Sequence, residues 1–314
     1  MLNISAIIPT YNNAAFIKDA VLSIQNQTVP PAEIIIVDDG STDNTQYIVQ
    51  QLDGNIQYIR QQNRGPSAAR NAGIKAAKGD WIAFLDADDQ WTTDKLEKQI
   101  KALQHSPELK LLAGDMSEID IDNQILEASV LNKHHFLEKF KALDGKPLPD
   151  AFIELLRKNF IPTGTVLIKK DILLEAGLFN DNIRYGEDLE LWAKVASQHP
   201  VTCLPDVLML RRQHGSNSTQ SAEPLLIDLI KVMESLKSYT SKQHIQSYNP
   251  DQCITEALNN LGYWYFNNRQ FSQAQTIFRR SLKARPTIKA LLYLIICLLP
   301  NRLVARLRSL KQWL

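Results

Sequence analysis

The sequence of 314 residues has few cysteines and no long apolar run. Its three cysteines, Cys203, Cys253 and Cys297, are far apart and form no Cys-x-x-Cys or Cys/His cluster. This spacing argues against a disulfide framework or a zinc site, and free thiols in a reducing compartment are expected. The longest apolar run, residues 290–299, has ten residues, whereas a membrane-spanning helix needs about 20. No transmembrane segment is therefore expected.

Signals for export and for two common nucleotide-binding folds are also missing. The first residues enter a strand-like segment, residues 4–8, without the basic region and apolar core of a signal peptide. A cytoplasmic protein is therefore expected. No Gly-x-Gly-x-x-Gly follows this segment, and the chain has no Gly-x-x-x-x-Gly-Lys-Ser/Thr. Ordinary dinucleotide binding and P-loop nucleotide binding are disfavoured.

Acidic residues are absent from the last part of the chain. Residues 257–314 contain no Asp or Glu but ten Lys or Arg, whereas the first 256 residues hold 25 basic and 34 acidic groups. This asymmetry predicts a basic tail with a partner of its own. We expect no nucleic acid there, because neither an aromatic stacking platform nor a known nucleic-acid-binding fold accompanies the charge.

The first 113 residues alternate between the hydrophobic periods of strands and helices. Runs rich in β-branched and aromatic residues predict strands at residues 4–8, 33–37, 56–60, 81–85 and 109–113. Helical patterns lie between them at residues 16–24, 43–52, 67–77 and 92–103. Asn12 or Asn13 is expected to cap the first helix. This alternation predicts an α/β fold with a mainly parallel central sheet, in which ligands bind beyond the carboxyl ends of the strands.

The pattern also predicts where the domains end. It weakens between residues 119 and 160. It then returns with expected strands at residues 166–169 and 201–204 and helices at 172–176 and 188–197. A stretch rich in Ser, Asn, Thr and Gln follows at residues 215–223, which is typical of a domain end. We expect an α/β domain at residues 1–220, a linker or helix at 221–254 and a helical segment at 255–314.

Two of the expected strands end in clusters of aspartates. Asp38 and Asp39 follow one strand, and Asp86, Asp88 and Asp89 follow another. Because neighbouring carboxylates repel one another, both clusters need a cation or hydrogen-bond donors. Mg²⁺ or Mn²⁺ suits the second cluster. Either cluster alone could be an Asx turn or a helix cap, but two on the same sheet edge indicate a ligand site.

Other aspartate-based folds do not fit this spacing. A receiver domain places its acid pair after the first strand, which here ends in residues 9–12, Pro-Thr-Tyr-Asn. A haloacid-dehalogenase phosphatase needs Asp-x-Asp-x-Thr/Val, whereas Asp88 is followed by Asp89 and Gln90. Nucleotidyl transfer to a sugar phosphate would need a glycine-rich loop with a basic residue near the N-terminus, and residues 9–13 offer neither.

Four motifs, in the right order and spacing, resemble those of the family 2 glycosyltransferases with the GT-A nucleotide-sugar-binding fold. They are residues 7–12 (IIPTYN), 37–43 (VDDGSTD), 65–71 (GPSAARN) and 84–89 (FLDADD). The resemblance, over residues 1–215, implies an inverting, metal-dependent transfer from a UDP- or dTDP-sugar. The implied acceptor is a saccharide or lipid-linked saccharide of envelope polysaccharide or glycan synthesis. A non-catalytic nucleotide-sugar-binding scaffold that acts through its helical tail is the alternative.

The resemblance also implies roles for single residues. The nucleotide-sugar-binding residues would be Pro9, Thr10, Tyr11, Asp39, Arg70 and Asp86. Asp39 would accept the N3–H of uracil or thymine, since a carboxylate offers only acceptors. The ligands of Mg²⁺ or Mn²⁺ would be Asp88 together with Asp86, Asp89 and His214, the last from a late motif at residues 211–218.

The catalytic residues are implied by a Glu-Asp motif at residues 185–192. Asp188 would be the general base and Glu187 the alternative base. Acids at the start of a helix also favour its dipole, which is the simpler reading. Residues 163–165 would lie near the acceptor sugar, and Asn180 stands where the family often has Asp.

The tail has two helical patterns. Residues 255–267 and 271–284 predict a helical pair with the tetratricopeptide spacing, and a plain helical hairpin is the alternative. One such pair cannot bury its own core, so it must pack on something else. Beyond Pro286, apolar and basic residues interleave up to Trp313. This pattern fits a helix at an anionic membrane surface, on the cytoplasmic face. A core-packed capping helix is the alternative.

Overall fold

The computed structural model describes residues 2–215, 222–241 and 249–299. The chain forms two compact units, Met1–Ser218 and Thr219–Leu314. We call them the N-terminal unit and the C-terminal unit and describe each by itself. The tail residues Arg302, Arg306, Arg308, Lys311 and Trp313, on which part of the membrane prediction depends, lie outside the described residues.

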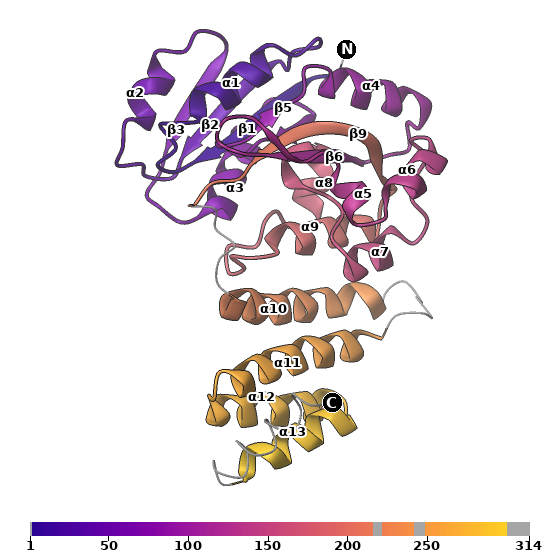
Figure 1. Cartoon of the computed structure of the whole chain (residues 1–314). Coiled ribbons are helices and arrows are strands. Elements are labelled where there is room, and N and C mark those ends of the chain that lie inside the picture. Colours follow the sequence, from indigo (N-terminus) through magenta and orange to yellow (C-terminus); the bar gives the residue numbers. More distant parts are fainter. Residues whose placement is uncertain (1, 216–221, 242–248, 300–314) are drawn as a thin grey trace. The chain divides into compact units, whose positions relative to one another are not determined.

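The N-terminal unit is built on a nine-stranded sheet with the order β3-β2-β1-β4-β8-β6-β9-β5, in which β7 also pairs with β6 (Figure 1). The strands are β1 (Ile4–Thr10), β2 (Glu33–Asp38), β3 (Ile56–Arg60), β4 (Trp81–Phe84), β5 (Gln90–Trp91), β6 (Leu111–Ile119), β7 (Ile125–Glu127), β8 (Leu167–Lys169) and β9 (Val201–Arg212). The predicted α/β class is confirmed. Strands β3, β2, β1 and β4 are parallel, whereas β8 runs antiparallel to both β4 and β6, which makes the sheet mixed.

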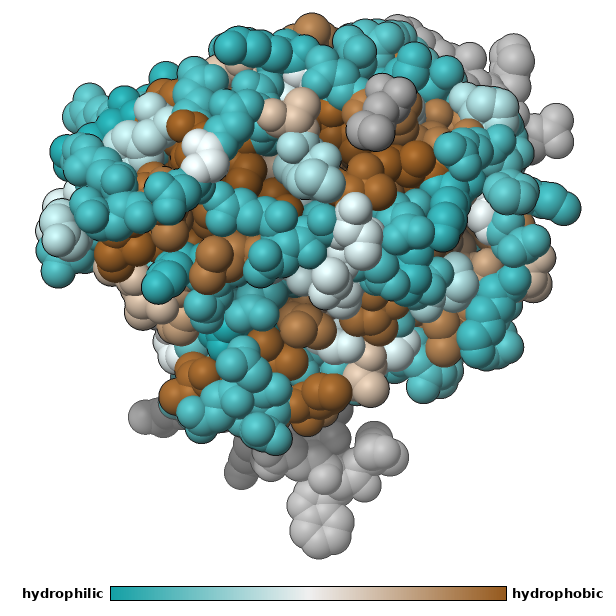
Figure 2. All heavy atoms as spheres, turned by 90° about the horizontal axis from the view of Figure 1, so that it is seen from above, coloured by the Kyte–Doolittle hydropathy of each residue, from teal (hydrophilic) through white to brown (hydrophobic). Residues whose placement is uncertain are grey.

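The central strands are apolar because the sheet is covered on both faces. Every residue of β1, β2 and β4 is buried, as expected for parallel strands between two layers. Alternate side chains enter different cores: Ile7 belongs to one cluster, and Ile4, Ala6 and Ile8 belong to the other. The outer strand β3 is only half-buried. Figure 2, a view from above, shows mostly hydrophilic side chains on the surface, with apolar ones between them.

Six helices in the described part of the N-terminal unit match the predicted segments to within a few residues, whereas the helices between residues 130 and 157 lie where the sequence predicted none. The helices of this unit are α1 (Ile17–Gln25), α2 (Thr45–Gln50), α3 (Pro66–Ala76), α4 (Lys95–His105), α5 (Val130–Lys133), α6 (Leu137–Leu143), α7 (Ala151–Arg157), α8 (Lys170–Glu175) and α9 (Glu187–Ala196), with a short 3₁₀ helix at Thr163–Thr165. Helix α3 lies close against β1, since a Cβ on Gly73 would be 2.5 Å from Cγ2 of Ile7. This contact fixes α3 beside the edge where the aspartates emerge.

The predicted cap of the first helix is wrong. Helix α1 begins at Ile17, and Phe16, its N-cap, makes no side-chain hydrogen bond. Asn12 is in the left-handed region, with φ of 54°, and its side-chain oxygen accepts the backbone N–H of Thr42 at 2.8 Å. Asn12 therefore holds the loop after β2, and the carbonyl of Asn13 begins the turn that leads into the helix.

The C-terminal unit is helical, as predicted. Its helices are α10 (Ala222–Ser241), α11 (Pro250–Asn267), α12 (Phe271–Ala284) and α13 (Ile288–Leu298). Helix α11 starts earlier than expected because the Asn249 side chain caps it and proline suits its first position. Gly262 of α11 allows Phe278 of α12 to approach, since a Cβ there would lie 2.8 Å from the ring. Among the described helices, none combines the length and apolar character needed to cross a membrane.

Candidate active site

The carboxyl edge of the parallel strands gathers most of the predicted site residues. Thr10 is in register with Asp38, and Ile7 is in register with Phe84. The segments after β1, β2 and β4 therefore leave the sheet side by side. Thr10 is buried, and its hydroxyl has no hydrogen-bond partner among the described residues. Tyr11, the next residue, has 47% of its surface exposed, which leaves its ring available to a ligand.

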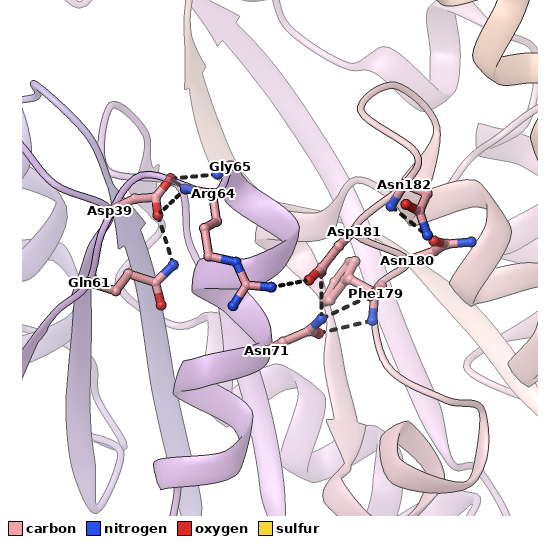
Figure 3. Close-up of polar contacts among 9 residues, drawn as sticks. All are labelled: Asp39, Gln61, Arg64, Gly65, Asn71, Phe179, Asn180, Asp181 and Asn182. Carbon is pink, nitrogen blue, oxygen red and sulfur yellow. Dashed lines mark hydrogen bonds and ion pairs between the residues drawn. The ribbon is translucent and has the colours of Figure 1, made fainter.

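Asp39 holds the loop that leads into α3 (Figure 3). Its buried carboxylate accepts the backbone N–H groups of Arg64 at 2.9 Å and Gly65 at 2.7 Å. A third donor is Nε2 of Gln61 at 2.7 Å from Oδ1. The backbone donors are fixed by the turn, whereas the Gln61 side chain can rotate away. Asp39 can therefore offer Oδ1 to the N–H of another planar group. Gln61 was not identified from the sequence.

Asp38 has a structural role next to this site. Its Oδ1 accepts the backbone N–H of Ser41 at 2.7 Å, and its Oδ2 accepts the hydroxyl of Tyr58. Burial and the Asp38 charge hold the pKa of Tyr58 well above its ordinary value. The two adjacent aspartates thus have different roles. Asp38 stabilises its own turn and binds strand β3, whereas Asp39 binds the loop before α3.

Arg70 joins the sheet edge to the start of α9. Its guanidinium lies 2.8 Å from Oδ1 of Asp86 and 3.0 Å from Oε1 of Glu187, and its side chain is only 6% exposed. Burial opposes the charged form, but Asp86 and Glu187 outweigh it, so the pKa of Arg70 is raised above its usual value. The guanidinium of Arg70 therefore connects Asp86, a predicted nucleotide-sugar-binding residue, with Glu187, a predicted catalytic residue.

Glu187 and Asp188 are the first residues of α9, after Gly186 in the left-handed conformation with φ of 83°. Burial, followed by repulsion from Asp188, raises the pKa of Glu187 to about 7. Burial also raises the pKa of Asp188, against hydrogen bonds from the backbone of Leu189 at 2.7 Å and from Asn159 at 3.0 Å. Two neighbouring carboxylates whose pKa values are both raised by burial suit proton transfer. The contribution of Asn159 could not be seen in the sequence.

Asp88 and His214 face one another, with Nε2 of His214 2.9 Å from Oδ2 of Asp88. Two ligands of an octahedral ion, at bond lengths of about 2.1 Å, stand about 3 Å apart. The two side chains now contact each other directly, and the same spacing would suit two ligands of one divalent cation. Within the described ranges, no group of three or more His, Cys, Asp or Glu side chains converges as a ready-made metal site. Diphosphate oxygens and water would have to complete the coordination.

The other two aspartates of this cluster point elsewhere. Asp86 is bound to Arg70. Asp89 is buried and accepts the backbone N–H of Arg212 at 2.9 Å. Burial, and then repulsion from Asp88 and Asp86, raises the pKa of Asp89 well above its ordinary value. Of the four predicted metal ligands, Asp88 and His214 are the two whose side chains contact each other among the described residues.

Strand β9 brings His214 to the site. It runs antiparallel to β5, with Leu210 in register with Gln90, so residues 211–214 pass beside the aspartate cluster. His214 stacks on Phe16 with ring centroids 5.1 Å apart, and the guanidinium of Arg212 lies 5.4 Å from the same ring. In the sequence, Phe16 is only the first residue of the helix expected at 16–24, and no local pattern identifies it as a support for His214.

The predicted acceptor segment, Thr163–Thr165, is packed inside the unit. All three residues are buried. A Cβ on Gly164 would lie 2.1 Å from the sulfur of Met209, and the Gly164 carbonyl accepts Nε1–H of Trp91 at 2.8 Å. The proximity of this segment to an acceptor sugar stays a prediction.

The mixed sheet, with its aspartates at the carboxyl edge and an acid pair opening α9, is a GT-A fold. The crystal structure of Staphylococcus aureus TarS residues 1–349 has the same fold, with a TM-score of 0.66 and 20% identity over 91% of this chain and 81% of that one. The corresponding TarS complex with UDP-GlcNAc has a TM-score of 0.65, also at 20% identity, and covers 91% of this chain and 82% of that one.

The sequence comparisons show the family. Residues 5–152 match Glycosyl transferase family 2. The chain is 30% identical over 238 residues to the putative teichuronic acid biosynthesis glycosyltransferase TuaG of Bacillus subtilis, which covers 70% of this chain and 84% of TuaG. It is 42% identical over 240 residues to an uncharacterized glycosyltransferase of Nostoc, covering 70% and 68%. The chain belongs to glycosyl transferase family 2. It spans 36% of the length of an uncharacterized Rickettsia conorii glycosyltransferase, with which it shares 33% identity over 236 residues and 73% of its own length.

Proposed function

We propose that the protein is an inverting, metal-dependent glycosyltransferase of cell-envelope polysaccharide synthesis. It would transfer a sugar from a nucleotide diphosphate to a hydroxyl of a saccharide or lipid-linked saccharide. The observation that carries the proposal is the buried Arg70, which binds Asp86 at the sheet edge and Glu187 at the start of α9. A scaffold that only binds a nucleotide sugar would not need a second carboxylate pair on the other side of this arginine.

The donor is proposed to be a UDP-sugar. Tyr11 can stack on a base, and Asp39 can accept the N3–H of uracil after Gln61 turns away. TarS, which shares the fold, has been crystallised with UDP-GlcNAc, so this sugar is the first donor to test. The decisive experiment is a panel of UDP-, dTDP- and GDP-sugars with Mn²⁺ present, in which nucleotide release and transfer are measured. Tight UDP binding without release from any donor would favour the scaffold alternative.

The residues of the site divide the reaction between them. Asp39 and Tyr11 hold the base. Asp88 and His214 would hold Mg²⁺ or Mn²⁺, which when bound neutralises charge on the diphosphate. Asp188 takes the proton from the acceptor hydroxyl, and this oxygen attacks the anomeric carbon as the bond to the diphosphate breaks. Glu187, paired with Arg70, is the second carboxylate beside that proton. A single displacement of this kind inverts the anomeric configuration.

The Asp39 assignment can be tested by UDP binding. Asp39→Asn is expected to weaken UDP binding by about 10–100-fold, since a hydrogen bond to a charged group is worth about 1.5–3 kcal/mol. Isothermal titration calorimetry with UDP measures this change. Gln61→Ala is the matched control: it removes the donor that occupies Oδ1 of Asp39 and should leave UDP affinity equal or higher. Unchanged UDP affinity in Asp39→Asn would contradict base recognition by this carboxylate.

We further propose that the C-terminal unit attaches to the cytoplasmic face of an anionic membrane through α13. Five apolar side chains of this helix are 49–80% exposed: Ile288, Leu291, Leu292, Ile295 and Leu298. At helical spacing they form one stripe, opposite the buried Ala290 and Cys297. Exposed cations flank the stripe at Arg285 and Lys289, and residues 257–314 contain no acid. An apolar stripe beside exposed positive charge fits anionic lipid.

The membrane proposal predicts loss of vesicle binding on polar substitution of the stripe. Leu291→Ser with Ile295→Ser should weaken co-sedimentation with phosphatidylglycerol vesicles by about tenfold or more, because each buried apolar side chain contributes about 1.5–3 kcal/mol. Leu126→Ser, at an exposed leucine of β7 in the N-terminal unit, is the matched control and should bind normally. If the wild type does not co-sediment with these vesicles, and the double variant instead loses self-association in sedimentation velocity, the stripe is a protein interface.

A further inference from the structure

Asn71 of α3 holds the chain that precedes the Glu-Asp pair (Figure 3). Its Nδ2 donates to the carbonyl of Phe179 at 2.8 Å and to Oδ1 of Asp181 at 3.1 Å. Its Oδ1 accepts the backbone N–H of Phe179 at 3.0 Å. One side chain therefore satisfies both backbone groups of Phe179 and also binds a carboxylate two residues further on. We call these contacts the Asn71 clamp.

The clamped residue lies beneath the arginine of the site. Phe179 is buried, and its ring centroid is 5.3 Å from the guanidinium carbon of Arg70. Its ring also packs edge-on against Phe84 at 5.6 Å and Trp192 at 5.6 Å. Phe84 ends the strand that leads to Asp86, and Trp192 lies in the helix that begins with Glu187. Phe179 thus packs against Arg70, against the strand that leads to Asp86, and against the helix that begins with Glu187.

We propose that Asn71 is a positioning residue for the transfer reaction. It fixes Phe179, and through Phe179 it sets the position of Arg70 between Asp86 and Glu187. The inference rests on the proposed function and adds to it a residue that touches none of the reacting groups. An amide is required, because the side chain must donate to the Phe179 carbonyl and to Asp181 while it accepts from the Phe179 N–H. A carboxylate has no donor for the first two contacts.

The loop that contains Phe179 also contacts the residues next to Asp39, through Asp181. Nη2 of Arg64 lies 3.3 Å from Oδ2 of Asp181, and the backbone N–H of Arg64 is bound by Asp39. The Arg64 and Asp181 side chains are 67% and 38% exposed, so this ion pair contributes little by itself. The buried part of the connection is the pairing of Asn71 with Phe179, and the test is directed at that pairing.

Asn71→Asp is the variant that tests the clamp, because it keeps the shape and removes the donor. We expect kcat to fall by about 10–100-fold, the effect of a small misplacement of catalytic groups, while donor KM and UDP affinity stay within about twofold. Asp181→Asn, added to Asn71→Asp, returns one donor to the contact and should recover part of the lost kcat. Asn180→Asp is the matched control. It adds the same charge to the same loop, where the Asn180 side chain accepts the backbone N–H of Asn182 at 3.0 Å, and it should leave kcat unchanged.

A second measurement does not depend on turnover. Hydrogen exchange of residues 178–190 should become faster in Asn71→Asp, return toward the wild-type rate in the double variant, and stay unchanged in Asn180→Asp. Unchanged exchange, or a normal kcat in an active Asn71→Asp enzyme, overturns the proposal. So does a parallel loss of kcat, UDP affinity and melting temperature, which would show a general folding defect. A wild type that transfers no sugar would count against the proposed function alone, since the exchange result still decides the clamp.

Discussion

Replacement of Asp188 by Asn should lower kcat by about 10²–10⁴-fold, the usual contribution of a positioned general base. The substitution keeps the size of the side chain at the start of α9 but removes its ability to take a proton. Asp188 is bound by Asn159 at 3.0 Å and is not part of the Asp39 base site. UDP affinity should therefore stay near the wild-type value. Steady-state kinetics at saturating donor, with calorimetry of UDP, separates the two effects.

Two comparisons decide whether Asp188 is the base. If Glu187→Gln abolishes transfer and Asp188→Asn does not, the base is Glu187. Asn159→Ala should have a smaller effect than either, because it removes a hydrogen-bond donor and leaves both carboxylates. A product with retained anomeric configuration would contradict direct displacement altogether.

The pH profile tests the same pair of groups. Burial raises the pKa of Glu187 to about 7 and raises the pKa of Asp188 above its ordinary value. Because the base must be unprotonated to accept a proton, kcat should fall as the pH is lowered from neutrality. The midpoint belongs to the coupled pair rather than to one residue. The acidic limb should shift or disappear in Asp188→Asn.

Asp88→Asn should abolish turnover and weaken UDP binding in the presence of Mg²⁺ or Mn²⁺. The carboxylate of Asp88 would repel a diphosphate if no cation lay between them. EDTA should inactivate the wild type, and added Mn²⁺ should restore it. Full activity in EDTA would reject metal dependence.

Two neighbouring variants give the Asp88 result its meaning. His214→Ala should raise the Mn²⁺ concentration needed for half-maximal activity, because His214, two residues after β9, faces Asp88. Asp89→Asn should cost much less than Asp88→Asn, since Asp89 accepts a backbone N–H and its pKa is already raised. Equal losses in Asp88→Asn and Asp89→Asn would show that the cluster acts as a whole.

The sequence could predict those strands and helices that are determined by the local pattern of residues. Strands β1, β2 and β4 are continuous apolar runs because both of their faces are covered, and their ends are marked by the first turn residues and aspartates. The parallel register then places Asp39 and Asp88 on one edge. Helix α3 begins at Pro66, one residue before the predicted start at residue 67, because proline suits the first helical position.

The sequence could not predict contacts between distant segments. Arg70 and Glu187 are 117 positions apart, and no local pattern shows that they form an ion pair. Asn159 and Phe16 support Asp188 and His214 from other elements, and each looks ordinary in its own segment. The antiparallel pairing of β8 was missed for a related reason. Strand β8 has only three residues, and so short a strand does not show from its own sequence whether it runs parallel or antiparallel to its neighbours.

The place of β9 in the sheet affects how the chain is synthesised. β9 is the last strand of the N-terminal unit, yet it lies between β6 and β5. Until residues 201–212 have left the ribosome, β6 has an open edge, and β5 lacks the one strand it pairs with in the described structure. Open strand edges favour aggregation of a nascent chain. A translation product that stopped before β8 and β9 would lack the strand that joins β4 to β6. The N-terminal unit is therefore expected to fold after its synthesis is complete, with chaperones protecting its first half until then.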